Sequence, residues 1–393
     1  MNEEKSEAAG SVKKVMPKRK KKIMLNPAWF IKTVTLALKY KSTLVFTGNK
    51  VWGVCESSGE NVVVMFKPDK EWCDEITRQF PTGAIFGCDT IHPTGEIHNK
   101  MKSYSKVAID EKSKSYINEP NGVLHVKGAG VVLKSGAFFE TDSPIPKLPR
   151  AKAIPFNYGE HVDNETHTLI LGSLGKDDTH RNLQRCFTQM VNGELLLIAT
   201  NARTLVGVKM DGVPPSFSYH PNNVNITEVS GFVSVVDAAK TTINVYKMND
   251  GVTLYEIPAN ESMVFPEVAK ILVPADTCDH DGVVNGDSLF KICTTVSKMG
   301  LGNGAMTRNL VFNKGKISLV TEEGVLAVFD AKVDIGDDDT VTFAYDILAQ
   351  FAKTKKDISV HSFNPGYCKN DIMRFVAMPI RAAPPPSSAE DEE

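Results

Sequence analysis

Short runs of β-branched and aromatic residues recur along this chain, and fewer segments show the spacing of an amphipathic helix. The first helix is expected to begin at Asn26-Pro27, because Phe30, Val34 and Ala37 then fall on one face. We expect it to be followed by strands at 43–47, 51–55 and 61–66, then an irregular stretch with Pro68, Pro81 and Gly83, a helix at about 94–104, and strands at 106–109, 123–127 and 131–140.

Two further rounds of similar elements follow a proline-rich linker at 143–149. The second is predicted to contain a helix end or irregular turn at 180–189, strands at 194–200 and 204–210, a helix at 233–240, and strands at 243–247 and 252–257. The third is predicted to contain helices at 287–299 and 344–353 and strands at 310–313, 317–321, 325–333, 358–362 and 373–378, with hairpin turns at 313–315 and 322–324. A module of helix, strands, helix and strands thus appears three times, which predicts an α+β protein built from equivalent domains.

Composition fits several domains of a water-soluble type. The chain has 393 residues, 23% of them charged, and a net charge of −2. We expect a disordered basic arm at 1–22, domains at 23–150, 151–265 and 266–381, and a disordered acidic tail at 382–393. The basic composition at 17–22 is that of a nuclear address, a nucleic-acid patch or a solvated tail.

The cysteines and the apolar runs indicate the compartment. Seven cysteines are scattered without a C-x-x-C pair, which favours a reducing compartment over a disulfide framework or a zinc site. Apolar runs are too short for a membrane span, and the N-terminus lacks the apolar core of a signal peptide. We therefore expect a cytoplasmic protein without membrane contact.

Catalytic motifs are weak. Cys278-Asp279-His280-Asp281 could suggest a metal, but its possible ligands are adjacent in a loop, and the carboxylates Asp334 and 337–339 are typical of a hairpin turn. The glycine-rich run at 300–304 follows a helix and not a strand, so a nucleotide-cradling loop is not expected. No nucleophile is seen with its base, and neither a cofactor nor a metal is predicted.

The segment at 371–381 opens as a strand and ends in Met378-Pro379-Ile380-Arg381. Such an apolar tip with a cation suits one wall of a groove for a short apolar peptide. The alternative is an ordinary closing strand whose tip packs on its own core.

Three stretches, at 264–274, 193–205 and 375–381, resemble the bacterial DNA polymerase III sliding clamp, its beta subunit. They match that family's Phe-Pro-acidic crossing into its last domain, its Thr-Asp-Gly-His-Arg-Leu turn after a strand, and its Tyr-Val-Val-Met-Pro-Met-Arg ending. The resemblance is good over 176–381 and only architectural over 23–150.

This resemblance implies three clamp-type domains, each with two helices packed on antiparallel sheets, in a ring of two chains joined head to tail. Such a homodimer encircles double-stranded DNA without sequence preference and is not an enzyme. It tethers the replicative DNA polymerase, and it binds polymerase and clamp loader through linear peptide motifs. The divergent first domain and the added tails point to a phage or an otherwise unusual replication system.

The resemblance also places three sets of residues. The peptide groove would comprise Leu183, Thr200, Arg203, Thr204, Leu205, Pro266, Ile271, Val376, Met378, Pro379, Ile380 and Arg381. Long cations suit a hole that attracts phosphates without holding them, and the DNA-facing candidates are Lys32, Lys39, Lys100, Lys102, His180, Arg181, Arg185, Lys240, Lys291, Lys298, Lys353, Lys355 and Lys356. The candidate subunit interface is Phe138 and Phe139 with Met299 and Leu301.

The turn at 200–205 departs from the family pattern. Asn201 replaces the family aspartate, Ala202 the glycine, and Arg203-Thr204 the His-Arg pair. These changes bear on which peptides bind. Two alternatives to the clamp stay open: a peptide-binding adaptor of the same fold that does not encircle DNA, and a DNA-processing enzyme.

Overall fold

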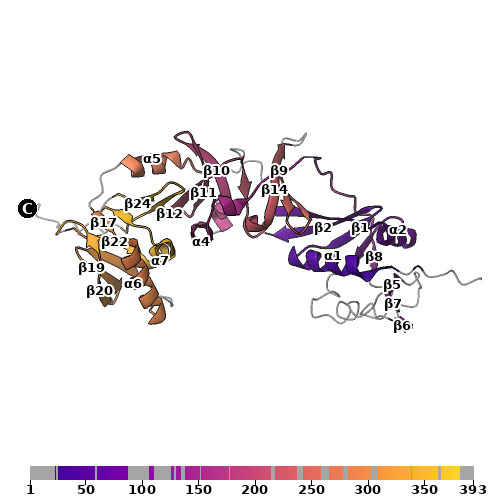
Figure 1. Ribbon diagram of the computed structural model, residues 1–393, viewed down its shortest axis with the longest axis horizontal. Coiled ribbons are helices and arrows are strands. Elements are labelled where there is room, and N and C mark those ends of the chain that lie inside the picture. The colour runs from indigo at the N-terminus through magenta and orange to yellow at the C-terminus, as the bar shows by residue number, and fades with distance from the viewer. Residues whose placement is uncertain are drawn as a thin grey trace, which may run out of the picture. The chain divides into compact units, whose positions relative to one another are not determined.

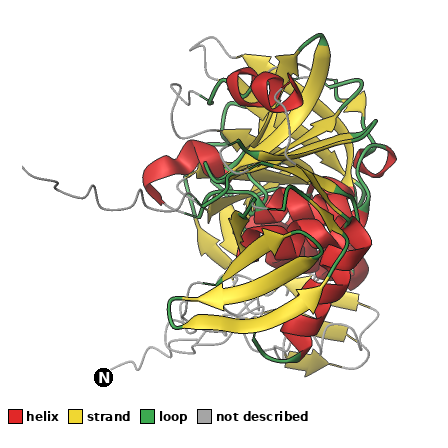
Figure 2. Ribbon diagram, turned by 90° about the vertical axis from the view of Figure 1, so that its left-hand side faces the viewer, coloured by secondary structure: helices red, strands yellow, loops and turns green. Residues whose placement is uncertain are grey.

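The computed structural model describes residues 23, 25–57, 60–86, 106–109, 125–127, 130–133, 138–150, 152–176, 178–213, 217–236, 242–257, 265–277, 282–301, 308–337, 339–361 and 364–380. The chain forms two compact units, Met1–Trp52 with Pro68–Ile145 and Gly53–Lys67 with Pro146–Glu393. We call them unit 1 and unit 2 and describe each by itself. Strands make up most of the regular structure (Figure 2).

Unit 1 packs helices on a sheet around an aromatic core. Its sheet has the order β8-β4-β1-β2, and its elements are α1 (Pro27–Lys39), β1 (Leu44–Thr47), the start of β2 (Lys50–Ser57), α2 (Lys70–Gln79), β4 (Ala84–Phe86) and β8 (Phe138–Glu140). The Asn26 side chain accepts a hydrogen bond from the amide of Ala28 at 2.9 Å and so begins α1 where expected. Phe30 stacks on Trp72 of α2 with ring centroids 4.4 Å apart and meets the edge of Phe86.

The stretch predicted to be irregular contains α2, so that prediction was wrong. Asp69 caps this helix by accepting from the amide of Trp72, and the helix buries Trp72 and Ile76. The helix lies between Pro68 and Pro81, and because prolines are typical of turns the segment between them was predicted to be irregular. The helix predicted at 94–104 lies outside the described residues. A second sheet, β5-β7-β6, consists of β5 (Lys106–Ile109), β7 (Gly130–Leu133) and β6 (His125–Lys127), with β5 and β7 parallel.

Unit 2 contains three antiparallel groups of strands (Figure 1). The first has the order β3-β16-β15-β14-β9: β3 (Glu60–Phe66), β16 (Thr253–Ile257), β15 (Thr242–Met248), β14 (Val229–Val236) and β9 (Ile154–Pro155). The second has the order β13-β10-β11-β12-β25-β24-β23-β17-β21: β13 (Ser218–Tyr219), β10 (Cys186–Val191), β11 (Glu194–Thr200), β12 (Thr204–Lys209), β25 (Met373–Ala377), β24 (Gly366–Lys369), β23 (Ile358–Val360), β17 (Gly282–Val284) and β21 (Val333–Asp334). The third has the order β20-β19-β18-β22: β20 (Gly324–Asp330), β19 (Lys316–Thr321), β18 (Asn309–Asn313) and β22 (Val341–Ala344).

The helices of unit 2 are α4 (Asn164–Gly172), α5 (Ala269–Thr277), α6 (Gly286–Lys298) and α7 (Tyr345–Phe351). The predictions of α6, of α7 and of both hairpins in the third module are confirmed. The helix predicted at 233–240 was wrong, because 229–236 form strand β14, paired along its length with β15; residues 237–240 lie outside the described chain. Two helices were not predicted: α4, which Asp163 caps, and α5, which replaces part of an expected linker.

Candidate functional site: the chain end and the β11–β12 turn

The turn between β11 and β12 is built by its own side chains. The Asn201 carboxamide oxygen accepts from the backbone amides of Arg203 and Thr204 at 3.0 and 2.8 Å, and from the Thr204 hydroxyl at 3.0 Å. The Thr200 hydroxyl donates to the Thr204 carbonyl at 2.7 Å. Ala202 has a φ of +67°, a conformation that glycine adopts more readily. The polar contacts therefore fix the turn despite the replaced glycine.

Strand pairing joins this turn to the end of the chain. Leu205 lies opposite Val376 in the β12–β25 ladder, and the amide of Met378 donates to the Arg203 carbonyl at 2.9 Å. Two residues further on, the amide of Ile380 donates to the Thr342 carbonyl at 2.8 Å. The terminal segment is thus held between the β11–β12 turn and β22.

The third stretch of the predicted groove packs on the same core. Phe265 stacks on Phe187 with ring centroids 4.3 Å apart. The amide of Val268 donates to the Gln189 side chain at 2.9 Å, which fixes the start of α5. Ile271 packs against a core cluster that contains Leu205 and Val376. Residues far apart in the sequence therefore meet here.

Exposure divides the predicted groove residues. Leu205 and Val376 are buried in the core cluster, and Thr200 and Thr204 are buried as well, so in this structure these four offer little surface to a peptide. Arg203 and Ile380 are exposed, and the half-buried members are Leu183, Pro266, Ile271, Met378 and Pro379. Arg381 lies outside the described residues. The accessible part is therefore mainly apolar, with Arg203 as its described cation.

A cavity of about 280 Å³ adjoins the turn and is lined by Asn201, Arg203 and Thr204 together with residues of α4 and α7. Asp346 and Gln350 of α7 and Lys176 add polar groups to its wall. α4 and α7 contact each other in unit 2. The site thus combines an apolar strip with a polar recess.

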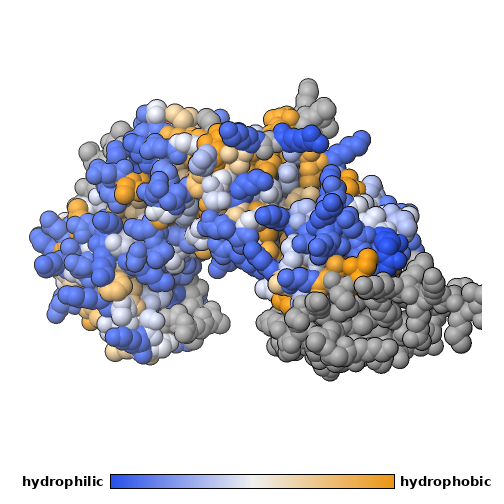
Figure 3. Space-filling view, turned by 45° about the vertical axis from the view of Figure 1, so that its right-hand side comes forward, coloured by the Kyte–Doolittle hydropathy of each residue, from blue (hydrophilic) through white to orange (hydrophobic). Residues whose placement is uncertain are grey.

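Most predicted DNA-facing cations are on the surface. The exposed members are Lys32 and Lys39 of unit 1 and His180, Arg181, Lys291, Lys298, Lys353, Lys355 and Lys356 of unit 2. Lys100, Lys102 and Lys240 lie outside the described residues. On the face seen in Figure 3, hydrophilic residues dominate and hydrophobic ones gather in patches between them.

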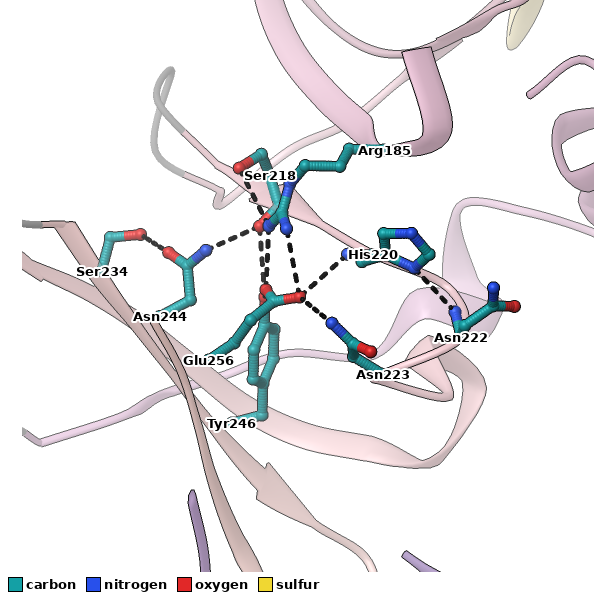
Figure 4. A network of polar contacts seen from close by, with 9 residues as sticks. All are labelled: Arg185, Ser218, His220, Asn222, Asn223, Ser234, Asn244, Tyr246 and Glu256. Atoms are coloured by element: carbon teal, nitrogen blue, oxygen red, sulfur yellow. Dashed lines mark hydrogen bonds and ion pairs between the residues drawn. The ribbon is translucent and has the colours of Figure 1, made fainter. Parts of the chain in front are cut away.

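Arg185 was assigned wrongly to the DNA-facing set. It is 1% exposed and forms an ion pair with Glu256 at 2.9 Å. Glu256 also accepts from the Tyr246 hydroxyl and from the backbone amide of His220 (Figure 4). Burial favours a higher pKa for Glu256, but the Arg185 charge and these hydrogen bonds outweigh it and lower the pKa. Arg185 therefore stabilises the interior of unit 2.

The structure describes the side chains of only two of the four predicted interface residues. Phe138 and Phe139 lie on β8, the last strand in the described sheet order of unit 1, and their side chains are outside the description. Met299 is 61% exposed at the end of α6, and Leu301 is half-buried. The strand predicted at 325–333 corresponds to β20, but its place as the outer strand of its sheet, with Val325, Leu326 and Val328 exposed, was not predicted. An apolar run without alternation on that strand was the signal that could have identified it.

Comparison with known proteins places the fold. No family model matches the chain, and no curated protein matches its sequence. Solved structures do match, among them a Caulobacter crescentus DNA polymerase III beta protein at 12% identity, with a TM-score of 0.60 over 92% of this chain and 100% of that one. The chain has the sliding-clamp fold.

Two further clamp structures agree. The beta subunit of Streptococcus pyogenes DNA polymerase is 10% identical, with a TM-score of 0.57 over 91% of this chain and 99% of that chain. The DnaN sliding clamp of Bartonella birtlesii, bound to griselimycin, is 12% identical, with a TM-score of 0.60 over 92% and 99%. The predicted α+β clamp fold is thus confirmed, although sequence identity is only 10–12%. Among the described residues, no helix has both the length and the apolar character needed to cross a membrane.

Proposed function

We propose that this protein is a DNA sliding clamp, a ring that encircles duplex DNA and holds a replicative polymerase on it. The observation that carries this proposal is the clamp fold, which covers 92% of this chain and the whole of a clamp chain. The repeated elements and the exposed cations on α6 and after α7 support it. The ring itself is non-catalytic, and it acts in the cytoplasm of a bacterial or phage-infected cell.

The ring closes between two copies of the chain. We place one side of the contact on the β8 edge, with Phe138 and Phe139, and the other on the third module. On that module the candidate contact residues are Met299 and Leu301. The outer strand β20, with its exposed apolar side chains, is a further candidate. An outer strand with unpaired amides and exposed apolar side chains is suited to pairing with another strand.

The partner site is the groove beside the terminal segment. Its accessible apolar residues, Met378, Pro379 and Ile380 among them, suit leucine or phenylalanine anchors of a linear peptide in the polymerase or clamp loader. Arg203 supplies a cation for an acidic residue of that peptide.

The main alternative is a clamp-fold adaptor that binds peptides and does not encircle DNA. The mass of the full chain in solution separates the two. A ring requires twice the 43.1 kDa of one chain, with a central hole visible in electron micrographs. A stable monomer at all working concentrations would leave the adaptor, and metal-dependent nuclease activity would favour a DNA-processing enzyme.

A further inference from the structure

Unit 2 contains a second, larger cavity that shares Leu174 and Lys176 with the recess beside the β11–β12 turn but none of the predicted groove residues. Its volume is about 740 Å³, and it lies between α4, the segment at 181–184 and the loop at 219–226. This volume falls within the range of about 300–1,000 Å³ that is typical of small-molecule sites. The cavity can therefore hold a molecule of nucleotide size.

The charged groups on this cavity are cations. Lys176 and Arg181 line it, and both side chains are exposed at its rim. Among its described lining residues there is neither an aspartate nor a glutamate. Asp177 follows Lys176 in the chain but lies outside the described residues. Two flexible cations without a lining carboxylate favour an anionic ligand.

A buried hydrogen-bond donor lies deeper in the wall. His220 is 4% exposed, and its Nδ1 accepts from the backbone amide of Asn222 at 3.2 Å, so the neutral ring carries its proton on Nε2. Burial and the nearby Arg185 charge lower the pKa of His220, which favours this neutral form. Within the described residues, Nε2 has no hydrogen-bond partner. Figure 4 shows the ring beside Asn222.

A second histidine adds a donor. The Nδ1 atom of His167 lies 2.9 Å from the Tyr158 hydroxyl, and burial lowers the pKa of this imidazole. When the hydroxyl donates to Nδ1, the remaining proton of His167 is on Nε2. Both histidines lining the cavity can thus offer an N–H group while they are uncharged.

Part of the remaining wall is apolar, and Gln184, Asn222 and Asn225 add uncharged polar side chains to it. Leu171 is 41% exposed, Leu174 is half-buried, and Ile226 is buried. A ligand that fits this cavity therefore needs an anionic end for the donors and a flat or apolar end for the leucines. A phosphate joined to a nucleoside has both.

We propose that this cavity binds a nucleoside phosphate, with the phosphate between Lys176, Arg181 and His220 and the base against Leu171 and Leu174. A base paired within a duplex is stacked and cannot enter, so the ligand is a free nucleotide or an unpaired nucleotide of a DNA strand. The proposal goes beyond the clamp function and does not depend on ring closure.

Calorimetric titration of the full chain tests this site. The probes are dAMP, inorganic phosphate, deoxyadenosine, and one short single-stranded oligonucleotide with and without a 5′-phosphate. We expect dAMP to bind and deoxyadenosine to bind at least about tenfold more weakly, because the latter lacks the charge-assisted bonds. Tighter binding of the phosphorylated oligonucleotide than of dAMP assigns the site to a strand, whereas the reverse order assigns it to a free nucleotide.

The variant Lys176→Gln with Arg181→Gln should weaken dAMP binding by about tenfold or more. Its matched control is Lys316→Gln with Lys332→Gln, two exposed lysines of unit 2 outside the DNA-facing set, which should leave dAMP binding unchanged. All four side chains are exposed, so the fold should tolerate both variants. His220→Phe removes the buried donor and should weaken binding as well.

Three results would overturn the proposal. One is the absence of binding by dAMP and phosphate up to about 10 mM, and another is equal affinity for dAMP and deoxyadenosine. The third is unchanged dAMP affinity in the Lys176 and Arg181 variant. Retention of the protein on circular DNA is measured separately and does not enter this test.

Discussion

Ala202 shows how one residue can be kept in a conformation that suits glycine. Its φ of +67° is unfavourable for a residue with a Cβ atom, yet the hydrogen bonds of Asn201 and Thr200 hold the turn around it. The family pattern has a glycine where this chain has Ala202, so the replacement was visible in the sequence. The compensating hydrogen bonds were visible only in the structure. The strain is therefore local and removable.

Ala202→Gly should stabilise the protein by about 0.5–1 kcal/mol, because relief of the left-handed strain exceeds the entropy cost of glycine. Denaturant unfolding measures the change. Ala199→Gly, in the adjoining strand β11 where Ala199 is buried, is the matched control and should destabilise. A loss of stability on Ala202→Gly would show that the turn is not strained.

The Arg185–Glu256 ion pair is buried, and this burial could not be predicted from the sequence. Because Arg185 lies near a position where the family contacts DNA, a surface role was predicted for it. Its partner Glu256 is 71 residues away, on β16. Only the contacts of Arg185 with Glu256 of β16, which Tyr246 of β15 also contacts, reveal an interior cation.

Glu256→Gln or Arg185→Met should each destabilise unit 2 by about 3–5 kcal/mol, because a buried charge loses its partner. The pKa of Glu256 is lowered on folding, so its contribution is present above the unfolded value near 4.5 and is lost as the pH falls through the folded value. Unfolding measured against pH checks both effects. If Glu256→Gln kept the same acid sensitivity and stability, the pair would not stabilise the fold.

At the scale of elements, strands and hairpins were more predictable than helices. β11 coincides with its predicted residues, because a β-branched and aliphatic run ends in a turn held by Asn201. The helices α2, α4 and α5 were missed because they are short or contain or adjoin prolines, so tertiary packing fixes them more than local periodicity. β14 was assigned to a helix although its valines favour a strand.

The terminal segment carries the groove prediction. Met378→Ala with Ile380→Ala should abolish binding of a polymerase-derived peptide with leucine or phenylalanine anchors, because it removes accessible apolar surface. Fluorescence polarisation measures the affinity, and solution mass confirms the intact oligomer. The control is Ile372→Ala, which changes an exposed side chain just before the same strand, β25. Wild-type affinity in the double variant would show that the groove lies elsewhere.

The β20 edge carries the interface prediction. Val325→Lys with Val328→Lys should convert the oligomer to monomers, because two charges would be buried at a strand edge. Val236→Lys on β14, which is 64% exposed, is the control and should not change the mass. Analytical ultracentrifugation measures the mass in solution, and an unchanged dimer mass would exclude β20 from the contact.

At the scale of the whole molecule, the order of elements was informative where residue identity was not. Identity to the clamp structures is only 10–12%, yet their fold extends over at least 91% of this chain. That three marked stretches converge near the chain end was predictable in outline. Which of their side chains stay exposed was not predictable, since burial of Leu205 and Val376 depends on how α5 and Phe265 pack.

Retention on circular DNA tests the central claim most directly. The full chain is loaded onto a nicked circular duplex with its loader and polymerase peptide partners, separated by gel filtration at moderate salt, and then treated with an enzyme that cuts the circle once. A ring that encircles DNA stays with the circle and leaves after linearisation, because only topology holds it. Equal retention on circular and linear DNA, or on neither, would contradict the account.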